Sequence, residues 1–255
     1  KLRFSSTDFN SYNTLSYSKG SPQRKNGSFI ASDNYGLGLT IKEKKIGDPV
    51  CALVSRHITR GLGKKISSRI KLSPAAMEAT HDLDFVLWCM EPAKPIRVYS
   101  QTAYGAMQHE TGSADAQWLM ITMDNGVVLS VGAGWSMPPG YPNYSGTWIE
   151  VVGTDGMLVI DDTHRDVVFN TMKNGIQLPM SSMPGEPVDH VFAGPMHNET
   201  VHYLEAVAFD RPVMVTAEKA RRVMEVYMAA DLSDERNEVV DLPLSESKLS
   251  AVAAA

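Results

Sequence analysis

Apolar side chains recur at every second position through the middle of the chain, which is the periodicity of a β-strand. Asp124-Asn125-Gly126 and Gly153-Thr154-Asp155-Gly156 separate neighbouring runs, and such residues form tight hairpin turns. Strands joined by turns this short are antiparallel. The predicted strands are Val50–Ile58, Ile96–Thr102, Gln117–Met123, Val127–Trp135, Trp148–Val152, Met157–Ile160, Val167–Asn170 and an edge strand at Glu238–Leu244.

On either side of these strands the apolar spacing changes to that of helices. Ser73 can cap a helix that begins at Pro74, and Pro92 predicts that this helix ends near Met90. Its apolar residues lie around much of the cylinder, so we expect it to be largely buried. The basic, glycine-interrupted segment Gly61–Leu72 is predicted as a surface loop. Further helices are predicted at Tyr35–Lys45, Glu199–Phe209 and Ala217–Ala230.

Strands grouped between helices predict an α+β fold, with an open, mainly antiparallel sheet and helices packed on one face. In the run Trp118–Met123 both alternating faces are apolar, so the second face of the sheet also needs a cover. That cover is either a partner subunit or loops of the same chain. Residues 1–34 are rich in Ser, Asn, Gly and Lys and are predicted to be irregular, while residues 35–250 are predicted to form one domain.

Composition and charge exclude several classes of protein. The chain has 255 residues, 43% of them hydrophobic, and a formal net charge of −5, so it is a poor candidate for binding nucleic acid or an anionic membrane. No apolar run approaches the roughly 20 residues that cross a bilayer, and no apolar signal segment follows Lys1. Cys51 and Cys89 are too few for a disulfide framework or a cysteine-based zinc site. We therefore expect a soluble, cytoplasmic protein.

The densest group of titratable residues lies in the predicted helix that begins at Pro74. Glu78, His81 and Asp84 are three positions apart in succession, so in an α-helix they share one side. A carboxylate one turn from an imidazole can fix its tautomer, which suits a general acid or base working near neutral pH. The alternative is a helical histidine that is satisfied by a carboxylate and has no catalytic role.

Four other side chains are candidates for contact with a substrate. His57 comes at the predicted end of a strand, and three rings lie near a Pro/Gly-rich loop where sugars could stack: Trp135, Tyr141 and Tyr144. Ordinary packing is the alternative explanation for all of them. His190, His197 and His202 are separated by seven and five positions, which matches neither helical i, i+4 spacing nor a zinc motif, so no metal site is predicted.

Three segments together resemble the C-terminal domain of the glucose–fructose oxidoreductase/inositol dehydrogenase (Gfo/Idh/MocA) family. Lys45–Val50 is similar to the start of the first strand of that domain, His81–Trp88 to its H-x-x-D helix, and Glu150–Leu158 to its E-x-x-G-x-x-G hairpin. The order of the closing helices and strand also matches, and the resemblance covers roughly residues 35–244. The specific part of this resemblance is the order and spacing of the motifs over a long stretch.

Members of that family have a Rossmann domain that binds NAD or NADP and a second domain, built on an open sheet, that supplies a substrate face and an oligomer interface. The resemblance implies that this chain is the second domain of an NAD(P)-dependent oxidoreductase that acts on a sugar, polyol or related hydroxylated compound. It also implies a homo-oligomer formed through the sheet face, and a role for His81 as the proton donor or acceptor at the substrate oxygen. The candidate substrate contacts are Glu78, Asp84, His57, Trp135 and Tyr144.

The sequence departs from the family pattern in two ways. Met77 stands where the family has an aspartate, and the adjacent Glu78 is rotated by about 100° around the helix axis. No G-x-G-x-x-G fingerprint follows a strand and opens a helix, because Gly132-Ala133-Gly134 is followed by Pro138-Pro139. We therefore expect this chain alone to bind NAD(P) weakly or not at all.

Two other functions stay open on the sequence. A non-catalytic module that binds a ligand or partner, having lost its cofactor domain, would also explain Met77 and the missing fingerprint. The NAD-dependent glycosidase branch of the same family is a third interpretation, and it needs the missing domain as well.

Overall fold

The computed structural model of the chain describes nine stretches that lie mainly in the middle and C-terminal thirds. These are residues 23–25, 28–30, 46–138, 145–161, 169–173, 175–177, 186–188, 191–193 and 195–245. The chain divides into two compact units, one of residues 1–40 with 164–216 and the other of residues 41–163 with 217–255. The predicted helix at Tyr35–Lys45 lies outside the described residues.

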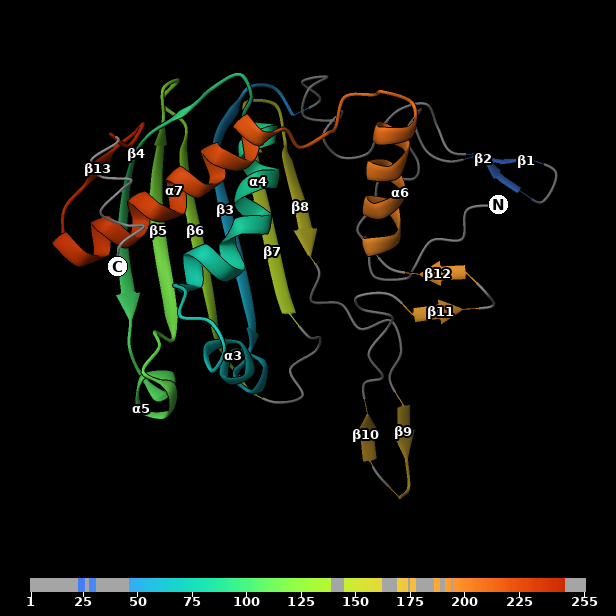
Figure 1. Cartoon of the computed structure of the whole chain (residues 1–255), viewed down its shortest axis with the longest axis horizontal. Coiled ribbons are helices and arrows are strands. Elements are labelled where there is room, and N and C mark those ends of the chain that lie inside the picture. Colours follow the sequence, from blue (N-terminus) through green and yellow to red (C-terminus); the bar gives the residue numbers. More distant parts are fainter. Residues whose placement is uncertain are drawn as a thin grey trace. The chain divides into compact units, whose positions relative to one another are not determined.

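The larger unit is built on one seven-stranded sheet (Figure 1). In sheet order its strands are β13 (Val240–Asp241), β4 (Pro95–Ala103), β5 (Ala116–Met123), β6 (Val128–Met137), β3 (Pro49–Thr59), β7 (Ser145–Gly153) and β8 (Met157–Asp161). All neighbouring pairs are antiparallel except β3 and β6, which run parallel. The predicted open, mainly antiparallel sheet is confirmed.

Helices cover one face of this sheet, as predicted (Figure 1). They are the π-helix η1 (Ala75–Ala79), α4 (Thr80–Cys89) and α7 (Ala217–Arg236), with the short α3 (Arg60–Ser67) and α5 (Ala106–Thr111) near the end of the sheet. The hydroxyl of Ser73 accepts a hydrogen bond from the backbone N–H of Ala76 at 3.0 Å, so the predicted cap is confirmed. The helix ends at Cys89, before Pro92, as the sequence predicts.

The alternation of side chains along the strands decides which residues form the core. In β5, Leu119 and Ile121 are fully buried beneath the helices, whereas Trp118 and Met120 are 46% and 47% exposed on the opposite face. Strand β7 alternates in the same way from residue 146 to residue 152, whereas residues 131–135 of β6 are all buried. We call the face that carries Trp118 and Met120 the open face.

Two hairpin turns set the register of neighbouring strands. Gly126 has φ +87°, which favours glycine, and its N–H donates to the carbonyl of Met123 at 3.0 Å. In the second turn the N–H of Gly153 donates to the carbonyl of Gly156 at 2.8 Å. The β5–β6 and β7–β8 pairs are therefore antiparallel hairpins, as expected.

The prediction of a loop at Gly61–Leu72 is wrong, because residues 60–67 form helix α3. Leu62 and Ile66, four positions apart, pack against a buried cluster of Ile58, Met107 and Trp135. Gly63 lies so close to Trp135 that a Cβ there would stand 2.6 Å from the Cβ of the tryptophan. The glycine that suggested a loop instead lets the helix approach the core.

The described residues of the smaller unit form three two-stranded ribbons and one helix. The ribbons are β1 (Gln23–Lys25) with β2 (Ser28–Ile30), β9 (Phe169–Thr171) with β10 (Gly175–Gln177), and β11 (Glu186–Val188) with β12 (Val191–Ala193). Helix α6 (Pro195–Ala208) agrees with the predicted helix at Glu199–Phe209. Across the described part of both units, no helix is long and apolar enough to cross a membrane.

The carboxylate of Asp115 holds the first turn of α5 against the sheet. It accepts hydrogen bonds from the N–H of Gly105 at 2.6 Å, from the N–H of Met107 at 3.1 Å and from the Ser136 hydroxyl at 3.1 Å. Burial raises the pKa of Asp115, but these hydrogen bonds outweigh burial and leave the pKa below its usual value. Asp115 is 8% exposed, so its loss would leave buried donors unpaired.

We expect Asp115→Asn to lower the free energy of unfolding by about 1–3 kcal/mol at pH 6, because a charged acceptor of several hydrogen bonds is lost. A carboxylate whose pKa is depressed in the folded state stabilises it fully above the ordinary aspartate pKa of about 3.9, and this contribution is lost as the pH falls through the folded-state pKa. The difference in the free energy of unfolding between the wild type and the variant should therefore become smaller below about pH 4. Urea unfolding at pH 6 and at acid pH measures it.

The matched control is Asp155→Asn in an exposed turn, which should change the stability little at either pH. Equal effects of the two substitutions at pH 6 would contradict the assigned role of Asp115.

Candidate functional site

His81 lies in the first turn of α4 with its side chain exposed to solvent. The other sides of the helix are packed into the core, where Leu83 and Val86 are fully buried and Leu87 is 2% exposed. The helix is thus held in place while the imidazole is presented outward. An exposed imidazole on a rigid element can exchange a proton with a bound ligand.

Glu78 does not share a side of the helix with His81, so that expectation is wrong. It belongs to the π-helix η1, whose i→i+5 hydrogen bonds change the phase of the following residues. Glu78 is 7% exposed and close to Arg56 and Asp82 beneath the helix. Burial raises the pKa of its carboxyl, the positive charge of Arg56 opposes this, and Asp82 adds to it.

Asp82, which follows His81, points into the protein and pairs with Arg56 of β3. The Nε and Nη2 atoms of Arg56 donate to the two carboxylate oxygens at 2.5 and 3.0 Å. Asp82 is 3% exposed. This two-pronged pair joins α4 to the middle of the sheet directly behind the exposed histidine.

Asp84 remains close to His81 and faces α7. Burial raises the pKa of Asp84, the positive charges of Lys219, His81 and Arg222 act against this, and Glu91 adds to it. Of the three residues predicted to act together, the structure thus keeps His81 and Asp84 as electrostatic neighbours and places Glu78 in the interior.

Met77, at the position of the family aspartate, is partly buried and packs against the cluster of Ile58, Met107 and Trp135. The side chain at this position therefore contributes apolar packing. It offers no carboxylate to a ligand near His81.

Trp135 lies in β6, within the predicted strand Val127–Trp135, but its expected role as a substrate contact is contradicted by its burial. It is 1% exposed, and its indole Nε1 donates to the carbonyl of Ala114. A ring enclosed in this way has no free face for a sugar, so we remove Trp135 from the proposed site. Tyr141 and Tyr144 lie outside the described residues.

Of the three histidines considered for a metal, His202 is the one whose side chain lies among the described residues. His202 accepts a hydrogen bond at Nε2 from the N–H of Met214 at 3.0 Å, and His190 lies outside the described part of the chain. Among the residues whose side chains are described, no three His, Cys, Asp or Glu residues are grouped to hold a metal ion.

His57 lies on the open face of the sheet, while its neighbour Arg56 points to the helices. The His57 ring is half-buried beside Trp118, with 6.1 Å between ring centroids, and burial lowers its pKa. The structure therefore places the two candidate histidines, His57 and His81, on opposite sides of the sheet.

Gly132 and Gly134 leave room for the rings of Trp118 and His57. A Cβ on Gly132 would lie 2.5 Å from the Trp118 ring, and one on Gly134 would lie 2.8 Å from Nδ1 of His57. Both glycines lie inside β6 and open no helix, so they form no cradle for a pyrophosphate. This segment therefore does not form a dinucleotide-binding fingerprint.

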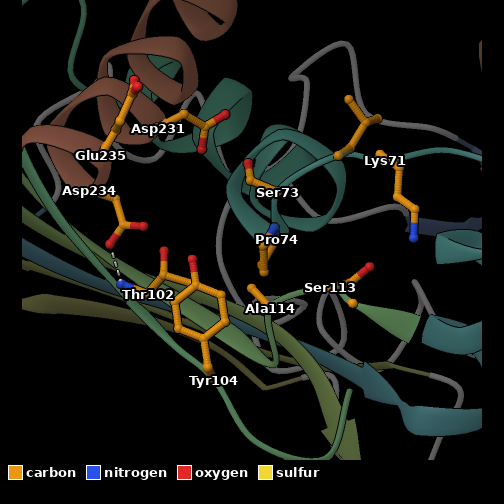
Figure 2. Close-up of a pocket in the computed structure, with 12 residues that line it drawn as sticks. Lys71, Ser73, Pro74, Thr102, Tyr104, Ser113, Ala114, Asp231, Asp234 and Glu235 are labelled. Carbon is orange, nitrogen blue, oxygen red and sulfur yellow. Dashed lines mark hydrogen bonds between the residues drawn. The ribbon is translucent and has the colours of Figure 1, made fainter. Parts of the chain in front are cut away.

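A pocket of about 430 Å³ lies on the helix-covered side of the sheet, away from the residues predicted from the sequence (Figure 2). Asp231, Asp234 and Glu235 of α7 line one side, and Thr102 and Tyr104, at the end of β4, line another. The feature of the sequence that could have indicated this pocket is the group of three acidic residues within one helical stretch. Such a group is also typical of a solvated helix face.

Two of the three carboxylates that line this pocket, those of Asp231 and Asp234, are already engaged within the protein. Asp231 accepts from Nε2 of Gln117 at 3.1 Å, and Asp234 accepts from the N–H of Thr102 at 2.7 Å. Burial raises the pKa of Asp231, and hydrogen bonds from Ser73 and Gln117 act against that rise. These contacts join α7 to β4, β5 and the start of η1, so we interpret them as structural.

The known proteins that resemble this chain match it over parts of its length. A curated relative, cis-3-hydroxy-L-proline dehydratase of Roseibium aggregatum, is 49% identical over 50 residues, which are 20% of this chain and 14% of that protein. Among solved structures, scyllo-inositol dehydrogenase from Lactobacillus casei with bound NAD(H) and scyllo-inositol matches with a TM-score of 0.62 at 16% identity. The match covers 80% of this chain and 59% of that one.

A second similar structure is myo-inositol 2-dehydrogenase from Lactobacillus plantarum, with a TM-score of 0.63, 15% identity, and coverage of 81% of this chain and 60% of that one. The chain thus spans well under two thirds of the length of these proteins, and at such identity the likeness is one of fold. The family model of the GFO/IDH/MocA C-terminal domain matches residues 40–159. The resemblance to the C-terminal domain of this family is thus confirmed over residues 40–159, a little under half of the chain.

Proposed function

We propose that this chain is the substrate-binding and oligomerisation part of an NAD(P)-dependent oxidoreductase that acts on a sugar, polyol or related hydroxylated compound. The observation that carries the proposal is the exposed imidazole of His81 on a helix whose remaining sides are buried, inside the segment that matches the family. The named activities of the two inositol dehydrogenases support the substrate class. NAD(P) would be held by a nucleotide-binding domain, which the described residues do not contain. The cytoplasmic location stays a prediction.

His81 would carry the proton of the reaction. When an alcohol becomes a carbonyl its oxygen loses a proton, and in the reverse direction that oxygen gains one. An imidazole can hold a proton near neutral pH, and Asp84 is close enough to His81 for the two side chains to interact electrostatically. The role of Asp84 in this proposal is therefore electrostatic.

A non-catalytic ligand-binding module is the second candidate function. Met77 supports it, because this position is packed into an apolar cluster where the enzymes of the family have an aspartate. The two candidates differ in the consequence of removing His81. Loss of turnover without loss of ligand binding supports the enzyme, whereas a protein that binds polyols and never turns them over supports the module.

The open face of the sheet supports the proposed assembly of identical subunits. Its exposed apolar side chains come from four strands: Leu53 of β3, Trp118 and Met120 of β5, Val128 of β6, and Met157 and Val159 of β8. Contiguous apolar surface of this kind on a sheet marks a protein–protein interface. A second copy could cover it with the same residues around a two-fold axis.

In the complete protein, His81→Ala should lower the rate of polyol oxidation by roughly 10²-fold or more, because the group that exchanges a proton with the substrate oxygen is removed. Steady-state assays with scyllo-inositol, myo-inositol and related polyols measure this. The matched control is His109→Ala, which removes an exposed histidine of α5 and should leave the rate unchanged. An unchanged rate for His81→Ala would remove this residue from the mechanism.

Met120→Lys should convert an assembled protein into monomers, because a desolvated charge in the centre of an apolar interface opposes association. Light scattering coupled to size-exclusion chromatography measures the mass in solution. Met224→Lys on α7 is the matched control, since Met224 and Met120 are both 47% exposed and only Met120 lies on the open face. A wild-type chain that is monomeric at all concentrations would overturn the proposed interface.

A further inference from the structure

The buried side of α4 carries a charged contact beside apolar residues such as Leu83 and Val86. Arg56 of β3 pairs with Asp82 through both its Nε and Nη2 atoms, at 2.5 and 3.0 Å. Asp82 is 3% exposed, and Glu78, also close to Arg56, is 7% exposed. Asp82 adjoins His81 in the chain, so the contact fixes the backbone directly behind the exposed imidazole.

Apolar packing alone determines the rotation of this helix poorly. Leu83, Val86 and Leu87 are buried on one side of α4, while the partly exposed Phe85 and Trp88 lie on the side of His81, so apolar residues surround the helix without a single stripe. Immediately before α4 the backbone is π-helical, and the i→i+5 pattern of η1 gives way to i→i+4 just ahead of His81. A two-pronged arginine–carboxylate contact, by contrast, is satisfied in one orientation.

We propose that Arg56 and Asp82 are positioning residues that set the rotation of α4 and thereby aim His81 at the substrate. This inference rests on the proposed acid/base role of His81. Buried ion pairs add little net stability, and their best-attested use is to specify one arrangement among several of similar energy. The pair therefore serves the geometry of the site more than the stability of the fold.

Replacing both Arg56 and Asp82 tests whether the pair positions His81 or stabilises the fold. Arg56→Met/Asp82→Leu removes both charges of the pair, and burial raises the pKa of the remaining Glu78 carboxyl, which favours its neutral form, so we expect the double variant to fold with nearly wild-type stability. In the complete protein its kcat should fall roughly 10–100-fold, since small misplacements of a catalytic group have effects of this size. KM should change much less, because the pair does not touch the substrate. Lys64→Met/Glu110→Leu, which removes a more exposed ion pair between α3 and α5, is the matched control and should leave kcat unchanged.

Adding His81→Ala to each background tests whether the pair acts through His81. His81→Ala should lower kcat by a much smaller factor in Arg56→Met/Asp82→Leu than in the wild type, because in the double variant the imidazole already points away from the substrate. If His81→Ala has no effect in the wild type, the proposed function fails. If that substitution is costly and Arg56→Met/Asp82→Leu retains the full kcat, the positioning role alone is overturned.

Arg56→Lys keeps the charge but loses the planar fork, and it tests the proposal should the double variant not fold. We expect a lowered kcat at a nearly unchanged melting temperature, and a fully active Arg56→Lys enzyme overturns the proposal. Residual dipolar couplings along α4, measured by NMR on this chain, provide a readout that needs no activity. They should report a changed rotation of the helix in both variants, and couplings identical to those of the wild type would also overturn it.

Discussion

A sheet with two apolar faces is the constraint on which the rest of this structure depends. The helices η1, α4 and α7 cover one face and bury Leu119, Ile121 and their neighbours. The same layer presents His81 outward, because the remaining sides of α4 are in the core. The other face keeps Trp118 and Met120 about half exposed, so the burial of apolar surface is incomplete in the isolated chain. The proposed site and the proposed interface thus lie on opposite sides of one sheet.

Polar groups inside the helix layer give that layer its precise geometry. Arg56 with Asp82, and Asp115 with the backbone of α5, are contacts in which a buried carboxylate is fully engaged by donors. Apolar side chains would tolerate small rotations and shifts of the helices, whereas such hydrogen bonds are satisfied in one arrangement. The pocket beside Asp231 and Asp234 follows the same principle, since its carboxylates connect α7 to the neighbouring strands.

Much of the fold could be predicted because its signals are local. The strand at Val50–Ile58, the helix start at Ser73 and the hairpin at Asp124–Gly126 depend on alternation, capping and turn residues within a few positions. The loop predicted at Gly61–Leu72 failed because Gly63 was judged by its helix propensity, while its role is to admit Trp135. The candidate site was harder to predict. Spacing predicted that Glu78 shares a side with His81, and Trp135 and His57 were predicted to contact the same substrate, yet Glu78 and Trp135 are buried and His57 lies on the open face.

The sequence by itself determined the strand and helix order, the antiparallel hairpins, the resemblance to the family, and His81 as the candidate acid/base residue. These properties follow from periodicity and from residue types at short range. Only the tertiary structure decided which face each side chain occupies: that Asp82 meets Arg56 beneath the helix, that Met77 joins an apolar cluster, and that Gly132 and Gly134 accommodate the Trp118 and His57 rings. The physical reason is that burial and pairing depend on contacts between elements far apart in the chain, and a π-helical turn of five residues is enough to change which side of a helix faces them.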